Sequence, residues 1–127
     1  MISTALLGLA GCAGTPRALL EVPTDPVPVD PLVAGIVIDA IEGRAAVSQQ
    51  PRLPAGEYSL LVRSRLDART LRQGPKRVTL QVQACQVYTL GAQHRSRFDP
   101  RFELLVVRQQ PMAGCVVDEG GAQPSAS

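Results

Sequence analysis

Residues 77–84 alternate strictly between polar and apolar side chains. The apolar members are Val78, Leu80, Val82 and Ala84. Successive side chains of a β-strand point to opposite faces of a sheet, so this period of two predicts a half-buried strand. The same alternation recurs over 57–65 and 86–93. No longer window carries the 3.6-residue period of an amphipathic helix, so the pattern favours an all-β chain.

Further strands are expected where the chain is apolar without alternation. Residues 33–41 and 102–108 are almost uniformly apolar, which predicts central strands or strands covered on both faces. A turn at Glu42–Gly43 should lead into a short strand over 44–48, whereas 66–72 would form either a helical turn or a solvated hairpin loop. Eleven Gly and eleven Pro interrupt the chain too often for long helices. The sequence therefore predicts a small β-sandwich of six or seven mostly antiparallel strands.

Composition excludes two classes of binding surface. Aromatic residues make up 3% of the 127 residues and there is no Trp, although 45% of the chain is hydrophobic. Base-stacking nucleic-acid surfaces and aromatic carbohydrate platforms both need several exposed rings. The net charge of +2 is too small to indicate nucleic-acid binding by itself. We therefore expect no nucleic-acid partner, and no small-molecule substrate is implied.

Residues 1–12 form an uncharged apolar run that ends in Leu9-Ala10-Gly11-Cys12. The run is too short to span a bilayer, which takes about 20 apolar residues. Its ending resembles the bacterial lipobox, and the chain resembles a small proteobacterial lipoprotein precursor. The resemblance implies a signal peptide over 1–11, cleavage between Gly11 and Cys12, and diacylglycerol on the Cys12 thiol, with an N-acyl chain added in many bacteria. Two or three acyl chains anchor a protein stably.

One feature departs from the lipoprotein pattern, because no Lys or Arg precedes the apolar run. A start upstream of Met1 would explain this, and the alternative is a chance apolar start with a buried structural Cys12. Ala13 stands where enteric lipoproteins retained in the inner membrane carry Asp. The resemblance therefore implies an outer-membrane anchor that faces the periplasm.

The proline content divides the rest of the chain. Residues 13–31 contain five prolines, which favour extended conformations that cannot continue a helix or an inner strand. We expect residues 12–31 to form the lipidated N-terminus and a tether, reaching about 50 Å at about 3 Å per residue. The alternative is an edge segment packed on the domain near Leu32. The β-sandwich is then predicted over 32–117, and 118–127 is predicted to be a disordered tail.

Cys85 and Cys115 remain as a pair once Cys12 is lipidated. In an oxidising compartment they are expected to form a disulfide, worth about 3–4 kcal/mol for a loop of about 30 residues. The alternatives are free thiols or a functional site. A zinc site would need four ligands, and only His94 is present to join the two thiols; a redox pair usually has Cys-x-x-Cys spacing. No metal site and no cofactor other than the covalent lipid are expected.

Two segments resemble known small modules. The turn at Ile38–Gly43 followed by Leu53-Pro54-Ala55-Gly56-Glu57-Tyr58 and an alternating strand is similar to the PEGA-type module of surface and periplasmic proteins. Pro54 would fix φ in the turn and Gly56 would supply a positive φ. Cys85-Gln86-Val87-Tyr88 with a distal Gly114-Cys115 is similar to small proteobacterial lipoproteins. These resemblances imply a fold and carry over no catalytic residue.

The sequence offers little for catalysis. His94 is the single histidine and is placed at a strand end or in a loop. No Gly-x-Ser-x-Gly elbow, His-Glu-x-x-His helix or phosphate-binding Gly-rich loop is present. Asp39 and Glu42 flank a turn and are expected to face solvent. We therefore predict no enzymatic activity.

Positive charge is concentrated in the middle of the chain. Residues 44–108 hold twelve of the thirteen Lys and Arg against four acids. Six candidate anion-binding residues gather around one hairpin: Arg63, Arg65, Arg69, Arg72, Lys76 and Arg77. A second group around another hairpin comprises Arg95, Arg97 and Arg101. Such residues suit anionic lipid head groups, lipopolysaccharide phosphates or an acidic protein; the alternative is a solvated surface.

The sequence thus predicts a membrane-anchored periplasmic lipoprotein that serves as a non-catalytic structural or binding module of the envelope. The alternative is an accessory outer-membrane lipoprotein of a secretion or transport apparatus, acting through protein–protein contacts. Under this alternative, the chain is similar to the small transthyretin-like sandwich of type VI secretion. In either case the partners expected are the membrane and other envelope components.

Overall fold

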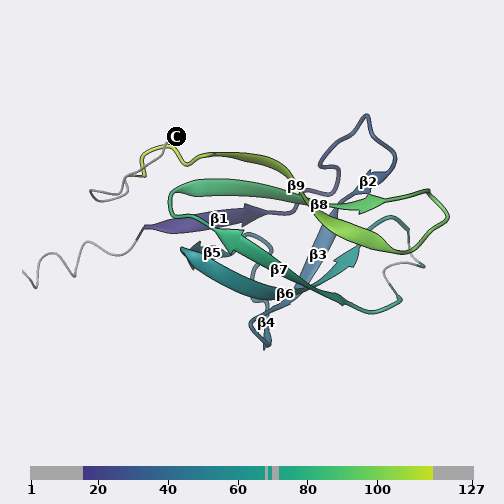
Figure 1. The fold of residues 1–127 in the computed structure, drawn as a ribbon, viewed down its shortest axis with the longest axis horizontal. Helices are drawn as coiled ribbons and strands as arrows, with labels where there is room; N and C mark the ends of the chain where they lie inside the picture. The colour runs from purple at the N-terminus through teal and green to yellow at the C-terminus, as the bar shows by residue number, and fades with distance from the viewer. Residues whose placement is uncertain (1–15, 68, 70–71, 116–127) are drawn as a thin grey trace, which may run out of the picture.

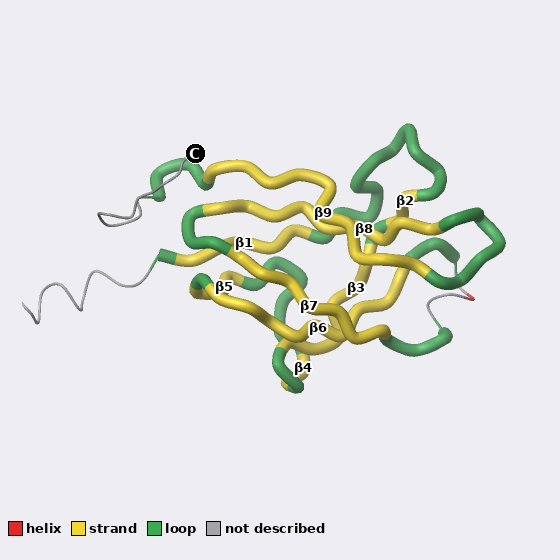
Figure 2. The backbone as a smooth tube through the Cα atoms, in the orientation of Figure 1, coloured by secondary structure: helices red, strands yellow, loops and turns green. Residues whose placement is uncertain are grey.

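The computed structural model describes residues 16–67, 69 and 72–115, which form a small β-sandwich of two sheets (Figure 1). Strands and their connections account for nearly all of this backbone (Figure 2). The strands are β1 (Arg17–Glu21), β2 (Val33–Ala34), β3 (Ile36–Ile41), β4 (Arg44–Ala45), β5 (Arg52–Pro54), β6 (Gly56–Ser64), β7 (Lys76–Val82), β8 (Gln86–His94) and β9 (Phe102–Pro111). The predicted all-β sandwich is confirmed, with nine strands in the described residues in place of six or seven.

Strand β8 is the centre of the first sheet. It pairs with β9 along its full length, from Gln86 opposite Pro111 to His94 opposite Phe102. On its other side it pairs with β1 in parallel and then with β2 antiparallel. Strand β5 pairs with β1 and completes the sheet. The β1 and β8 pair is the parallel one among strands that are otherwise antiparallel.

The second sheet has the order β4-β3-β6-β7 and is built from antiparallel neighbours. Glu42 and Gly43 connect β3 to β4 with φ of 52° and 79°, as a two-residue hairpin turn requires. Gly56, with φ of 152°, leads from the β5 turn into β6. Both turns predicted from the sequence are confirmed.

The core lies between the two sheets and is built from inward positions of the alternating strands. Sheet one contributes Ala18, Leu20, Tyr88, Leu90, Ala92 and Phe102, and sheet two contributes Ile36, Ile38, Leu60, Val62, Leu80 and Val82. Aliphatic side chains dominate this set, as the low aromatic content requires. The period-two prediction therefore selects the buried face correctly in β6 and β7, whereas β8 is buried on both faces and is not the half-buried strand that its alternation predicts.

The prediction of a tether over residues 12–31 is wrong for the part that the structure describes. Arg17–Glu21 is strand β1, and the side chains of Ala18 and Leu20 are fully buried. The connection after β1 also packs on the domain. A Cβ on Gly35 would lie 2.6 Å from the carbonyl oxygen of Pro23, so the absence of a side chain lets this connection approach β3. The domain therefore begins with β1, well before the predicted boundary at Leu32.

Strands β9 and β5 differ from the prediction, and some predicted segments lie partly or wholly outside the described residues. Strand β9 borders the first sheet and is mostly exposed, because residues 102–108 have a neighbour only in β8 among the described strands. Strand β5 is not among the predicted strands, since it has only three residues, follows Pro51 and ends in Pro54. The 66–72 segment belongs to the β6–β7 connection and is only partly described. The signal peptide, Cys12 and the 118–127 tail lie outside the described residues.

The long strands give the molecule two ends. The disulfide end comprises the start of β1, the turn between β7 and β8 and the residues after β9; the loop end comprises the β6–β7 and β8–β9 connections. In Figure 1 the disulfide end is at the left, where the described chain both begins and finishes, and the loop end is at the right. No helix within the described residues is both long and apolar enough to cross a membrane.

Candidate functional site

The disulfide end ties the two termini of the domain together. Cys85 and Cys115 form a disulfide, 30 residues apart in sequence, as the cysteine pair predicts. The amide of Cys85 donates to the carbonyl of Arg17 at 3.0 Å, and the amide of Met112 donates to the carbonyl of Cys85 at 2.9 Å. Cys85 has φ of 64°, a conformation uncommon for a residue with a side chain. Hydrogen bonds to β1 and to the chain after β9 hold it there.

Two of the six predicted anion-binding cations, Arg63 and Lys76, make ion pairs with acidic residues of the described chain. Arg63 lies on the outer face of the second sheet and makes a bidentate ion pair with Asp39, with Nε–Oδ2 at 2.7 Å and Nη2–Oδ1 at 2.8 Å. The hydrogen bond to Asp39 raises the pKa of Arg63. Arg77 is exposed on β7, and Arg65, Arg69 and Arg72 are exposed in the β6–β7 connection. Asp39 is therefore partly buried under Arg63, not simply solvent-facing, whereas Glu42 is exposed.

Lys76 joins the two sheets on the side where β7 meets β9. Its ammonium donates to the carbonyl oxygen of Phe102, lies 5.2 Å from the centroid of the Phe102 ring and is 3.6 Å from Glu103. These contacts leave Lys76 committed to the fold. Lys76, which was predicted to bind an anion, therefore connects the two sheets on this side of the sandwich.

The β8–β9 connection displays the second arginine group. Arg95, Arg97 and Arg101 are exposed, and Phe98 between them is 85% exposed. Arg101 donates hydrogen bonds to Asp99 from both its backbone amide and its guanidinium. These bonds lower the pKa of the Asp99 carboxyl, and the hydrogen bond from the guanidinium has the largest effect. A solvated aromatic ring among cations is the main apolar feature of the loop end.

His94 and Ser64 form a buried pair beneath these loops. Both side chains are 1% exposed, and Nε2 of His94 lies 2.7 Å from Oγ of Ser64. Nδ1 of His94 lies 2.9 Å from the carbonyl oxygen of Asp99. Because a carbonyl can only accept, Nδ1 carries the proton, and Nε2 accepts from the Ser64 hydroxyl. The Ser64 oxygen also accepts from the Leu66 amide at 3.2 Å, so the pair joins both loops of this end.

The geometry of this pair suits a structural tie. A serine nucleophile and a histidine base must reach a substrate carbonyl, with donors placed for the oxyanion. Here both side chains are buried, and the histidine is oriented by a backbone carbonyl. His94 lies at the end of β8, as predicted, whereas the participation of Ser64 was not predicted. The available signal was a polar residue at the inward position that follows Tyr58, Leu60 and Val62.

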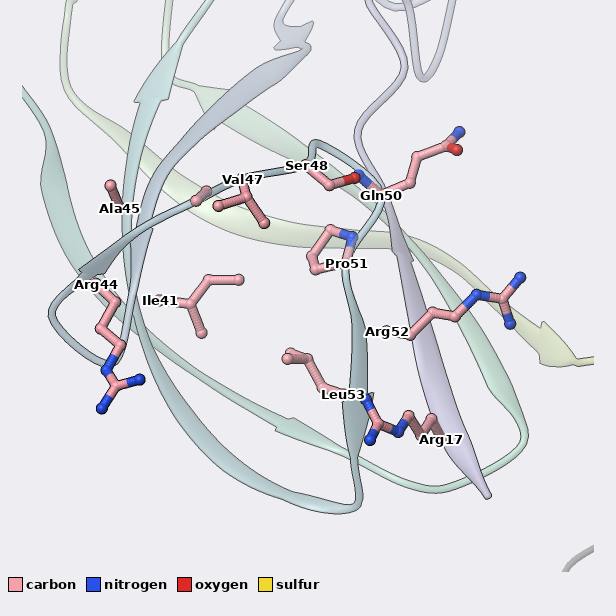
Figure 3. A pocket seen from close by; sticks show the side chains of 11 residues that line it. Arg17, Ile41, Arg44, Ala45, Val47, Ser48, Gln50, Pro51, Arg52 and Leu53 are labelled. Atoms are coloured by element: carbon pink, nitrogen blue, oxygen red, sulfur yellow. The ribbon is translucent and has the colours of Figure 1, made fainter. Parts of the chain in front are cut away.

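A cleft opens on the side of the sandwich opposite Lys76, between the edge strands β4 and β5 (Figure 3). Its volume is about 500 Å³. Ile41, Leu53 and Pro51 converge on it from β3, β5 and the chain between β4 and β5, and Val47 lies at its rim in the same connection. The cleft is thus an apolar hollow where the two sheets are not joined.

Hydrogen bonds fix the wall of this cleft. The side chain of Gln49 accepts from the amide of Ile38 and donates to its carbonyl, both at 2.8 Å, in the manner of a neighbouring strand. The amide of Ala46 donates to the carbonyl of Asp39 at 3.0 Å, and the amide of Leu20 donates to that of Pro51 at 3.0 Å. The connection from β4 to β5 is therefore tied to both sheets, and the cleft is preformed.

Arginines stand at the mouth of the cleft. Figure 3 shows the guanidinium groups of Arg17 and Arg44 on either side of the lower opening, whereas Arg52 turns away. In the described part of the chain, Arg17 and Arg44 form no ion pair. The sequence analysis included neither residue in its anion-binding set, because they are far apart in sequence and only the fold brings them to one opening.

No group of three His, Cys, Asp or Glu side chains arranged to hold a metal ion occurs in the described ranges. Comparison with known proteins found no matching family model, curated protein or solved structure. The geometry of the cleft, of the buried pair and of the two ends therefore carries the functional argument.

Proposed function

We propose that this chain is a lipid-anchored protein of the bacterial envelope, held by acylated Cys12, and that its β-sandwich is a non-catalytic structural or binding module. The observation that carries the proposal is the sequence Leu9-Ala10-Gly11-Cys12 placed directly ahead of a β domain. Ala13 after the cysteine favours the outer membrane, facing the periplasm. A disulfide between Cys85 and Cys115 suits that oxidising compartment.

The proposed module is non-catalytic because the pair of side chains that most resembles a nucleophile and its base, Ser64 and His94, is buried and hydrogen bonded within the fold. Ser64 and His94 are buried and hydrogen bonded to both loops of the loop end. The cleft between β4 and β5 is lined mainly by aliphatic side chains and arginines, and the described residues that line it include no carboxylate or histidine. Such a lining supports binding, not proton transfer.

Acylation of Cys12 is the direct test. Cells that produce the wild-type chain are grown with labelled palmitate, and label is expected on the protein. Cys12→Ser should abolish the label, because the thiol is the acceptor. The double variant Cys85→Ser and Cys115→Ser is the matched control and should keep it. Label that persists in Cys12→Ser would reject the anchor.

A second candidate function is an accessory lipoprotein of a secretion or transport apparatus. The observation that favours it is Phe98, which is 85% exposed in a loop that also carries Arg95 and Arg97. Aromatic and arginine side chains are the residues that most often dominate protein–protein binding energy. The loop end would then bind an acidic surface of an envelope protein.

This alternative is tested by placing a photo-crosslinking residue at position 98. Val29, which is 90% exposed in the β1–β2 connection, is the matched control position. One stoichiometric partner captured from position 98 and not from position 29 would favour the accessory role. Equal capture from both positions, or none, would remove it.

A further inference from the structure

The short distance between Cys12 and β1 limits where the domain can lie. Arg17 is the fifth residue after Cys12 and the first residue of β1. Five residues span at most about 17 Å when fully extended. If Cys12 carries the lipid, as the proposed function holds, Arg17 and the cleft it borders lie close to the head groups. The inference below rests on that proposal.

We infer that the cleft between β4 and β5 is a docking site for an anionic phospholipid of the anchoring membrane. Its apolar hollow, formed around Ile41 and Leu53, accommodates the glycerol and the upper acyl chain. Arg17 and Arg44 at the mouth face the phosphate, and neither has a carboxylate partner among the described residues. A guanidinium suits a phosphate because its donors match two oxyanion positions.

Val47 is the side chain that points to a lipid in preference to a soluble anion. It is fully exposed, at 101%, and lies at the rim of the cleft, in the connection between β4 and β5. Contact with an acyl chain would remove this apolar surface from water. The wall behind Val47 is held by Gln49 and Ala46, so little ordering is required when a ligand binds.

The loop end is directed away from the membrane in this arrangement. Strand β8 runs nine residues from Gln86, beside the Arg17 carbonyl, to His94. That is about 27 Å at the rise of an antiparallel strand. The arginines around Phe98 are then presented to the periplasm, whereas Arg17 and Arg44 meet the bilayer. The two groups of cations would serve different partners.

Single Trp probes test the docked arrangement, because the chain has no Trp of its own. The lipidated protein made by cells is reconstituted into vesicles of phosphatidylcholine and phosphatidylglycerol that contain brominated acyl chains. Val47→Trp places the probe at the rim of the cleft, and Val29→Trp is the matched control on an exposed valine elsewhere. Excitation at the red edge, which selects Trp over Tyr, should show strong bromine quenching for Val47→Trp and little for Val29→Trp.

The charge requirement is tested in the Val47→Trp background. Arg17→Gln with Arg44→Gln should reduce quenching, with each arginine contributing about a fivefold bias toward the docked state at low salt. Arg95→Gln with Arg97→Gln removes the same charge from the loop end and should leave quenching unchanged. In vesicles of phosphatidylcholine alone, the Val47→Trp protein should be quenched as weakly as the Arg17→Gln with Arg44→Gln variant is in the anionic vesicles.

The outcomes separate the two proposals. Absence of palmitate on the wild-type chain overturns the anchor and with it the distance argument. Palmitate present with equal quenching of the two Trp probes overturns the cleft alone. Equal losses from the two arginine pairs would show attraction to overall charge and overturn it as well. If the Val47→Trp probe emits as a buried indole that bromine does not quench, lipid does not enter the cleft and the inference is overturned.

Discussion

The disulfide end is held by a crosslink and by the main chain, whereas the loop end adds buried polar side chains to backbone hydrogen bonds such as those from Arg65 to Gly35 and from His94 to Leu32. At the first, Cys85 is fixed by a covalent bond and by backbone hydrogen bonds to Arg17 and Met112. At the second, the connections are tied by the hydroxyl of Ser64, the imidazole of His94 and the ammonium of Lys76. Backbone hydrogen bonds tolerate changes of side chain, whereas the disulfide and each side-chain tie at the loop end depend on one residue type.

This difference separates anchoring from presentation. The end nearest Cys12 has a shape set by strand pairing and a disulfide, as would suit a part that connects the proposed anchor to the domain. The loop end presents cations and Phe98 on connections whose conformation depends on a few polar groups. Substitutions at the two ends should therefore differ in how much they change the free energy of unfolding and in which part of the domain they affect.

The largest effect is expected at the disulfide end. Cys85→Ser with Cys115→Ser should lower the free energy of unfolding by about 3–4 kcal/mol, because the unfolded chain gains the entropy that the crosslink removes. Urea unfolding measures the loss. Either single variant should lose as much as the double variant, since each removes the whole crosslink. A loss below about 1 kcal/mol would mean that backbone hydrogen bonds alone hold this end.

The next effect is expected at Ser64. Ser64→Ala should cost about 1–3 kcal/mol, because Nε2 of His94 and the Leu66 amide lose a buried partner. Ser59→Ala, on the same strand, is the matched control and should stay within about 0.5 kcal/mol. Amide exchange should accelerate in the loop-end connections and not at Cys85 or Met112. Acceleration at both ends alike would remove the distinction between them.

A smaller effect is expected where Lys76 closes the side of the sandwich. Lys76→Met should cost about 0.5–1 kcal/mol through loss of the cation–π contact with Phe102. Arg77→Met, exposed on the same strand, should change stability by less than about 0.5 kcal/mol. Thermal or urea unfolding of the two variants gives the comparison. Equal changes would mean that Lys76 acts as an ordinary surface cation.

The smallest effect concerns the pH dependence of the β8–β9 connection. Hydrogen bonds from Arg101 lower the pKa of Asp99 in the folded chain. A lowered folded pKa contributes stability above the ordinary carboxyl pKa, and that contribution is lost as the pH falls through the folded pKa. NMR titration should place the Asp99 pKa below the ordinary carboxyl value, and Arg101→Gln should raise it only part of the way back, because the backbone amide of residue 101 still donates to Asp99. An unchanged titration in the variant would contradict the assignment.

Much of the fold was predictable because alternation is a local property. Strands β6, β7 and β8 carry the period of two, and Glu42–Gly43 carries its own turn chemistry. Strand β1 was missed because surrounding prolines dominate the pattern, although Ala18 and Leu20 alternate with more exposed neighbours. Strand β5 has only three residues, too few for a period to be visible.

The sites were less predictable because they combine distant residues. The disulfide was predictable from the sequence, because Cys85 and Cys115 remain as a pair once Cys12 is assigned to the expected lipid. The partner of His94 is 30 residues away and could be suspected only from a polar residue at an inward position. Arg17 and Arg44 meet at one opening because β5, the neighbour of β1, and β4 are edge strands on the same side of the sandwich. Sheet order of this kind is not encoded in any local pattern.

The parallel pairing of β1 with β8 sets the order in which the domain can be completed. Glu21 and Thr89, which face each other across this pair, are 68 residues apart. Contacts between such distant segments form slowly, because a long loop must close first. Synthesis from the N-terminus presents β1 early and supplies its partner β8 only after the β6–β7 hairpin has emerged. If Cys12 carries the proposed lipid, attachment to the membrane could therefore precede the pairing of β1 with β8.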